Sequence, residues 1–289
     1  FYTVTEHTKV PLTRLPYMQG WVWFQQGEFE KAVNSWKEFP DADYWLTMQG
    51  KVALEKGQAV SALEYLETAT LLAPNSSTAY YYGGLALFRL ERYDEALEWL
   101  HTALKLNDYD ERFAKDRNIG DVWWPADPEN LIYGASSAMT HVYISAIYYR
   151  LRQWDAMKDA AQAAVEANPQ LSLGYLQLGT AYFMHGELTG DMKDYRLAAE
   201  TFASVEDMVS DTTFPYYIYK ARVCWKLGDI SCANSAYVNV AKVSRFVNNH
   251  REVIHFFTET AQVETLTSLY ADVLVQTPQK PQYGYRWIM

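Results

Sequence analysis

Small residues recur in this chain at intervals of 34 residues, and this spacing limits the fold more than any other feature of the sequence. Gly50 and Gly84 are 34 residues apart, as are Ala62 and Ala96. A unit of two antiparallel helices explains the period, because small residues let the two helices approach closely and Pro74 stops the second one. The spacing therefore predicts a chain of repeated helical hairpins.

The best copy of the unit is Tyr80–Asn107, which reads YYYGGLALFRLERYDEALEWLHTALKLN. Its pair of glycines, its turn at Glu91–Arg92 and its later alanines resemble the tetratricopeptide repeat (TPR) family. Six copies can be followed over residues 13–247, with insertions at about 108–137 and 187–194. The resemblance implies an all-α fold, a right-handed TPR-like α-solenoid of about six helical hairpins, with the insertions in loops.

The two ends of the chain depart from the repeat. Residues 248–277 carry apolar side chains at three- and four-residue steps, which predicts one long amphipathic helix that caps the exposed flank of the sixth copy. Residues 1–12 are predicted to form an extended arm. Residues 278–289, PQKPQYGYRWIM, form an aromatic tail that we expect to dock on the solenoid or on a partner.

In the TPR family the first helix of each repeat lines the concave surface, so the resemblance implies an aromatic groove with a few basic residues. Tyr, Trp and Arg are also the residues that anchor interfaces. We expect the groove to take an apolar helix or an extended peptide, or to be filled by the chain's own insertion or tail; both alternatives stay open. The candidate groove residues are Tyr17, Trp21, Phe24, Tyr81, Leu85, Phe88, Arg89, Tyr149, Arg150, Phe183, Arg222 and Trp225.

The insertion at 108–137 is a second candidate contact surface. It is acidic and aromatic, and Trp123 and Trp124 stand at its centre. Long loops of this kind often carry function. Its carboxylates lack the twelve-residue spacing of an EF-hand, so a calcium site is not expected.

Composition and motifs disfavour several other classes of function. The formal net charge of −10 disfavours a nucleic-acid binder, and no apolar stretch reaches the 18 residues that a membrane span needs. None of the six His lies in an HExxH motif, and no phosphate-binding loop or nucleophile elbow occurs. We expect no catalytic centre, metal or cofactor. Only Lys51 has the chemistry of the clamp with which TPR cochaperones hold acidic chaperone tails, so that ligand is not expected either.

Two short motifs have alternative interpretations. Cys224 and Cys232 flank the turn of the sixth copy and form either a disulfide or two small packing residues, of which the second is favoured. Asn75-Ser76-Ser77 matches a glycosylation sequon but stands at a repeat boundary, where a helix cap is the favoured role.

The leading function is a non-catalytic scaffold that holds a partner protein. The alternatives are the soluble TPR module of a membrane-anchored cell-envelope enzyme, of the polysaccharide polymerase or ligase type, and a subunit of a large permanent assembly. Because the chain begins with Phe1 instead of Met, an extracytoplasmic or membrane-associated location is weakly favoured.

Overall fold

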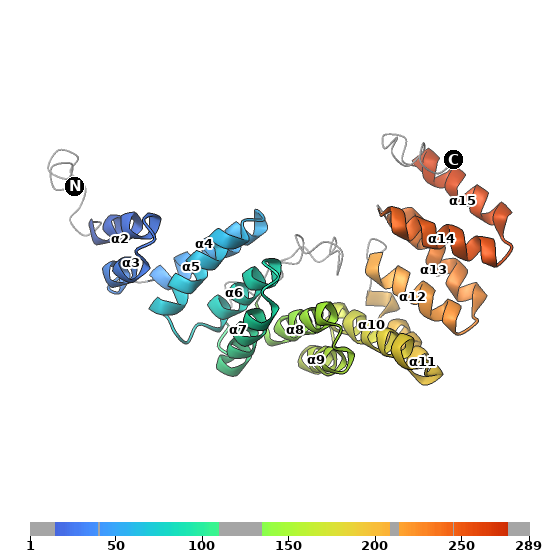
Figure 1. The fold of residues 1–289 in the computed structure, drawn as a ribbon, viewed down its shortest axis with the longest axis horizontal. Coiled ribbons are helices and arrows are strands. Elements are labelled where there is room, and N and C mark those ends of the chain that lie inside the picture. The colour runs from blue at the N-terminus through green and yellow to red at the C-terminus, as the bar shows by residue number, and fades with distance from the viewer. Residues whose placement is uncertain (1–14, 40, 110–134, 209–213, 245, 277–289) are drawn as a thin grey trace. The chain divides into compact units, whose positions relative to one another are not determined.

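The computed structural model describes residues 15–39, 41–109, 135–208, 214–244 and 246–276, and these are helical with no strand among them. The predicted all-α class is therefore confirmed, and the helices follow one another as short antiparallel pairs (Figure 1). The arm at 1–12, the tail at 278–289 and Trp123 and Trp124 lie outside the described residues. The helices are α2 (Leu15–Gln25), α3 (Phe29–Trp36), α4 (Ala42–Glu55), α5 (Ala59–Leu72), α6 (Ser77–Arg89), α7 (Tyr93–Leu106), α8 (Ser137–Leu151), α9 (Trp154–Ala167), α10 (Ser172–Thr189), α11 (Met192–Ala203), the 3₁₀ turn η4 (Glu206–Met208), α12 (Phe214–Lys226), α13 (Ile230–Val243), α14 (Val247–Glu259) and α15 (Val263–Gln276).

The helices belong to two compact units, and the division falls within α8 between Ile147 and Tyr148. In the first unit α2 packs on α3, α4 on α5 and α6 on α7, and α5 also packs on α6. In the second unit α9 packs on α10, α10 on α11 and α12 on α13, and both α14 and α15 pack on α13. Each unit is thus built from hairpins that bury their apolar faces against the next hairpin, as stacked repeats do.

Glycine explains how the two helices of a hairpin approach each other. A Cβ atom on Gly50 would lie 2.5 Å from Cγ of Leu66, and one on Gly84 would lie 2.6 Å from Cγ of Leu100. Only a residue without a side chain fits at such a distance, so the repeated glycine is a packing requirement of the hairpin. In both hairpins the glycine and its leucine are sixteen residues apart.

The fifth hairpin does not keep this sixteen-residue spacing, and the difference shows the effect of the insertion at 187–194. Gly179 makes the same kind of contact with Phe202, twenty-three residues further on, since a Cβ atom on Gly179 would lie 2.6 Å from Cε1 of Phe202. The seven additional residues lengthen α10 and α11 themselves, since α10 runs to Thr189 and Gly190 ends it in the left-handed conformation (φ 74°). The expectation that residues 187–194 form a loop is therefore wrong: they extend a helical hairpin.

Residues 248–277 form two helices, which corrects the prediction of one long helix. The helix ends and the chain turns at Ala261, which has φ 55°. The amide of Ala261 donates to the Thr258 carbonyl (3.1 Å), and the amide of Gln262 donates to the Phe257 carbonyl (2.8 Å). The sixth hairpin turns at Gly228 with the same pair of hydrogen bonds. The apolar period does not reveal the break, because both α14 and α15 keep a helical period on either side of it.

The last hairpin has one buried and one exposed side. Leu269 and Val273 of α15 are buried, whereas Glu264, Ser268 and Asp272 of the same helix are exposed. Capping repeats of solenoid proteins present such a polar outer face.

Replacing Ala261 by glycine is expected to raise the free energy of unfolding by about 1 kcal/mol, because glycine adopts positive φ without a Cβ clash. Chemical denaturation followed by circular dichroism measures the change. The matched control is Gly228→Ala at the same place in the sixth hairpin, which is expected to lower the free energy of unfolding by a similar amount. If both substitutions changed the free energy of unfolding in the same direction, the interpretation that the two hairpins share one turn conformation would be wrong.

Several helices begin with a side chain that accepts from the first free amides. Ser76 Oγ accepts from the Ala79 amide (3.3 Å) at the start of α6, so the predicted capping role of the Asn75-Ser76-Ser77 segment is confirmed. Asp229 caps α13 in the same way, with 2.9 Å between its Oδ1 and the amide of Cys232.

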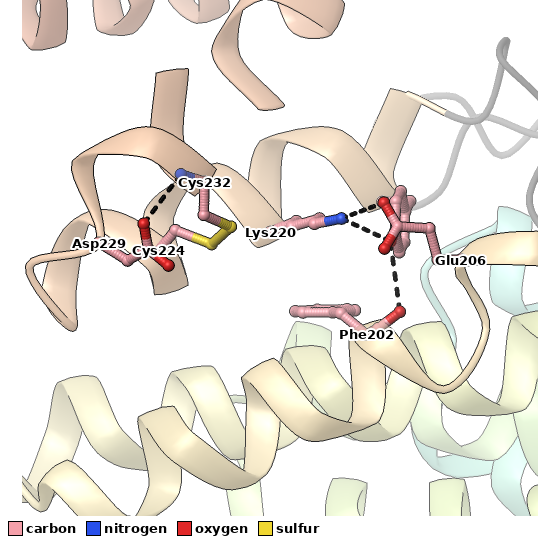
Figure 2. The surroundings of a disulfide bond; sticks show 7 residues. Phe202, Glu206, Lys220, Cys224, Asp229 and Cys232 are labelled. Carbon is pink, nitrogen blue, oxygen red and sulfur yellow. Dashed lines mark hydrogen bonds and ion pairs between the residues drawn. A yellow bond between two sulfur atoms is a disulfide. The ribbon is translucent and has the colours of Figure 1, made fainter. Parts of the chain in front are cut away.

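Cys224 and Cys232 form a disulfide, so the favoured interpretation of two unbonded packing residues is wrong. Figure 2 shows the bond joining α12 to α13 across their turn, with 5.7 Å between the two Cα atoms. One helical turn before Cys224, Lys220 reaches the carboxylate of Glu206 in η4. The sixth hairpin is therefore tied covalently at its turn and by an ion pair to the segment that precedes it.

Candidate functional site

The first helices of the second unit meet along one face. Phe183 of α10 contacts Tyr219 of α12, with 5.8 Å between the ring centroids. The hydroxyl of Tyr219 lies 3.1 Å from the hydroxyl of Tyr149 at the end of α8. On its other side, α12 reaches α14 through Arg222 and Glu252. We call this surface, formed by the end of α8 and by α10, α12 and α14, the first-helix face of the second unit.

Arg222 and Glu252 form the polar centre of this face, and buried Tyr237 of α13 supports Glu252 from below. Arg222 donates from Nε and Nη2 to the two carboxylate oxygens of Glu252, at 2.8 and 2.7 Å, and the hydroxyl of Tyr237 donates to Oε1 of Glu252 at 2.9 Å. Burial alone would lower the pKa of Arg222, but the hydrogen bonds and charge of Glu252 raise it. Burial and the same carboxylate raise the pKa of Tyr237. The three groups therefore hold each other in fixed positions.

Trp225 and Lys226 continue the face toward the hairpin turns. Half-buried Trp225 lies edge-on against Phe256 and His255, with ring centroids 5.3 and 5.5 Å away. Nζ of Lys226 lies 2.7 Å from Oε1 of Glu187, in the lengthened part of α10. Burial would raise the pKa of Glu187, but hydrogen bonds from Lys226 and Tyr195 lower it. The side chains of Lys226, Glu187 and His255 all keep part of their surface in contact with solvent.

Five of the predicted groove residues are core residues instead. They are at most 6% exposed, so little of each side chain reaches a ligand: Phe24, Tyr81, Leu85, Phe88 and Phe183. In the first unit, edge-to-face contacts between rings explain this burial, since Phe88 and Tyr81 both contact Tyr143, with ring centroids 6.3 and 5.8 Å apart. The period identifies these positions, but it does not show how far neighbouring helices cover them.

The other predicted groove residues keep some exposure. Tyr17 and Trp21 of α2 pack on Trp45, with ring centroids 5.9 and 5.4 Å away, and Tyr17 stays 37% exposed. Arg89 is half-buried and its Nη1 donates to the carbonyl of Leu54. Arg150 is exposed, and Tyr149, Arg222 and Trp225 are half-buried. The usable surface therefore includes fewer aromatic side chains than the sequence suggests.

Several residues of the face were not among the candidates from the sequence, including Glu187, Glu252 and His255. Glu187 lies in the segment interpreted as a loop, and the other two lie in the segment interpreted as a separate cap. Ala261 stands 33 residues after Gly228, so the last hairpin keeps the spacing of the repeat, but no glycine marks its turn in the sequence.

His250 joins the two helices of the last hairpin and is buried. Its Nε2 lies 3.0 Å from the carbonyl oxygen of Ser244, which only accepts, so Nε2 carries the proton. Nδ1 then accepts from the hydroxyl of Tyr270 at 2.8 Å. Burial lowers the pKa of His250, against the opposing effect of the Ser244 carbonyl. The neutral imidazole is therefore the form that fits this site.

The stability of the second unit is expected to fall with pH below neutrality because of His250. The pKa of the folded imidazole lies below its ordinary value of 6.5. The contribution of the neutral ring is therefore complete above that pH and is lost as the pH falls through the lowered pKa. Thermal unfolding between about pH 7.5 and 5.5 measures it, against a His250→Gln variant whose melting temperature should vary less with pH. Equal pH dependence in the two proteins would contradict the assignment.

The described ranges give no sign of a metal centre or of a membrane-spanning helix. Among them no group of three or more His, Cys, Asp or Glu side chains is arranged to hold a metal ion. No helix in these ranges is both long and apolar enough to cross a membrane.

Comparisons with known proteins agree with the repeat architecture. The tetratricopeptide repeat family model matches residues 47–111. A TPR repeat-containing protein of Methanocaldococcus jannaschii is 20% identical over 256 residues, which are 85% of this chain and 44% of that protein. The chain therefore spans less than half the length of this curated relative.

Solved structures show the same fold at low sequence identity. PilF of Pseudomonas aeruginosa has a TM-score of 0.59 at 15% identity, covering 84% of this chain and 96% of that one. MamA from Desulfovibrio magneticus RS-1 has a TM-score of 0.50 at 18% identity, covering 71% and 97%. A chain of the anaphase-promoting complex hetero-tetramer Cut9–Hcn1 has a TM-score of 0.60 at 13% identity, covering 98% of this chain and 50% of that one.

Proposed function

Because the chain is a tetratricopeptide repeat protein, we propose that it is a non-catalytic scaffold that binds a partner protein through the first-helix face of its second unit. Proteins of this family bind protein partners, and the face offers the residue types that anchor such interfaces. The partner contributes an apolar helix or an extended peptide, which are the two shapes that a row of parallel helices accepts.

The observation that carries the proposal is the arrangement of half-exposed side chains around Trp225. Its ring is supported by Phe256 and Tyr237, with centroids 5.3 and 6.2 Å away, while Arg222 is locked by Glu252. Side chains held in one conformation lose little entropy on binding, which favours them as anchors. The aromatic ring and the guanidinium group are thus preorganised for a contact.

The test is a pull-down from the native source with mass spectrometry, comparing the chain with a Trp225→Ala/His255→Ala variant. We expect a stoichiometric partner whose recovery falls at least about tenfold in the variant, since truncating a central aromatic anchor costs about 2 kcal/mol or more. The matched control is Ile230→Ala/Val263→Ala, which removes two exposed apolar side chains at hairpin turns of the same unit. Circular dichroism verifies that all variants fold.

The outcomes separate the candidate surfaces. Loss of the partner in the first variant and retention in the control supports the first-helix face. Retention in both, with loss in a Trp123→Ala/Trp124→Ala variant, moves the site to the 108–137 insertion. A chain that recovers no specific partner contradicts the scaffold function.

A further inference from the structure

The segment between α5 and α6 holds the one Asn-X-Ser/Thr sequon of this sequence, Asn75-Ser76-Ser77. Pro74 and Asn75 form the turn that joins the two helices, and both residues are exposed. Leu71, in the last turn of α5, is also 54% exposed. A bulky group attached to the side chain of Asn75 would therefore extend into solvent and would not disturb the core.

The helix cap does not account for the asparagine of this motif. The cap of α6 comes from Ser76, whose Oγ accepts from the Ala79 amide. Ser77 is fully buried, and its Oγ accepts from the Asp108 amide at 2.8 Å. Among the residues that the structure describes, the side-chain amide of Asn75 makes no hydrogen bond. The capping role and the sequon therefore involve different side chains and are compatible.

The disulfide between Cys224 and Cys232 is a second, independent observation that favours use of the sequon. Neither cysteine of the chain is a free thiol. Disulfides persist in oxidising compartments, such as those through which secreted proteins pass. Sequons in surface loops are glycan acceptors in secreted proteins. The bond and the exposed sequon thus indicate the same kind of compartment.

We propose that Asn75 carries an N-linked glycan, attached in an oxidising compartment through which the chain passes. The co-reactant is an oligosaccharide linked to a lipid phosphate. Nδ2 of Asn75 forms a bond to the anomeric carbon of the first sugar, and the bond between that carbon and the phosphate oxygen breaks. The amide proton leaves with the lipid phosphate. The proposal is independent of the scaffold function.

The folded structure limits when this reaction takes place. The hydroxyl at the third position of the sequon is part of what defines an acceptor. In the folded chain this hydroxyl belongs to Ser77, which is buried and bonded to the amide of Asp108, 31 residues later in the chain. A transferase reaches it only before this contact forms. The glycan is therefore attached before α7 and Asp108 have folded onto α6.

The test uses the full chain purified from its native source. Tryptic peptide Gly57–Arg89 contains the sequon, and mass spectrometry with fragmentation that keeps sugars attached is expected to locate sugar mass on Asn75. Alkylation before and after reduction is expected to modify Cys224 and Cys232 only after reduction. An unmodified Asn75, sugar on Ser76 or Ser77 instead, or alkylation of both cysteines before reduction would each overturn the proposal.

Variants expressed in the same source separate the sequon from the cap. Asn75→Gln and Ser77→Ala are expected to lose the glycan completely, whereas Ser77→Thr keeps it because threonine also completes the sequon. The matched control is Ser76→Ala, which keeps the glycan but has a lower melting temperature because α6 loses its cap. Sugar that persists in Asn75→Gln, or that disappears in Ser76→Ala, would overturn the proposal.

Discussion

Replacing Trp36 by alanine is expected to lower the free energy of unfolding by about 3–5 kcal/mol, which is a large part of the stability of a domain. Trp36 is 1% exposed, and its ring packs on Phe24 and Trp45, with centroids 6.0 and 6.2 Å away. Its indole nitrogen also donates to the carbonyl of Tyr17 at 3.1 Å. The substitution leaves a cavity and an acceptor without its donor.

Urea denaturation followed by circular dichroism measures the effect. The matched control is Trp23→Ala in the same hairpin. Trp23 is half-buried, and its ring is covered on one side by Nζ of Lys31 at 4.8 Å, so its loss should cost much less. If the two substitutions lowered the free energy of unfolding by similar amounts, the interpretation that buried Trp36 contributes more to the stability of the first hairpin than Trp23 would be wrong.

Replacing Glu252 by alanine is the second substitution with a large expected effect. It should lower the free energy of unfolding by about 3 kcal/mol. Glu252 accepts two hydrogen bonds from Arg222 and one from Tyr237, which is fully buried. Alanine at this position leaves a partly buried cation and a buried hydroxyl without their acceptor. The side chain of Arg222 keeps 33% exposure, so water recovers some of the cost.

A double-mutant cycle tests this interpretation. If the three groups act as a unit, Arg222→Ala/Glu252→Ala should be less destabilised than the sum of the two single variants. The control Glu259→Ala removes a carboxylate of the same helix that is 61% exposed and 4.0 Å from His255, and should change stability by less than about 0.5 kcal/mol. If the destabilisation of the double variant equalled the sum of the two single variants, the interpretation that Arg222 and Glu252 stabilise the protein jointly would be wrong.

The repeat spacing predicts the hairpins because it records a local requirement. Gly50 and Gly84 have no room for a side chain, so the same residue type has to return whenever the same hairpin returns. The cap at Ser76 follows in the same way from the free amides at the start of a helix. Features of this kind depend on neighbours within one hairpin and can be predicted from the chain alone.

The last hairpin shows where this reasoning stops. Ala261 takes a left-handed conformation that a glycine would mark in the sequence, and the apolar period does not change at the break. A helix and a helical hairpin therefore present nearly the same pattern over residues 248–277. As a result, Glu252 and His255 could not be assigned to the candidate site from the sequence.

The order of residues along the chain is enough to specify the all-helical class, the hairpin unit and the identity of its packing residues. Which first-helix positions remain accessible depends on the packed structure. Phe88 and Phe183 are buried while Trp225 keeps part of its ring exposed, although all three stand on first helices. The stacking of successive hairpins also places Glu252 against Arg222. The reason is physical: helix formation and hairpin contacts depend on residues close in the chain, whereas exposure and ion pairing depend on how successive hairpins stack.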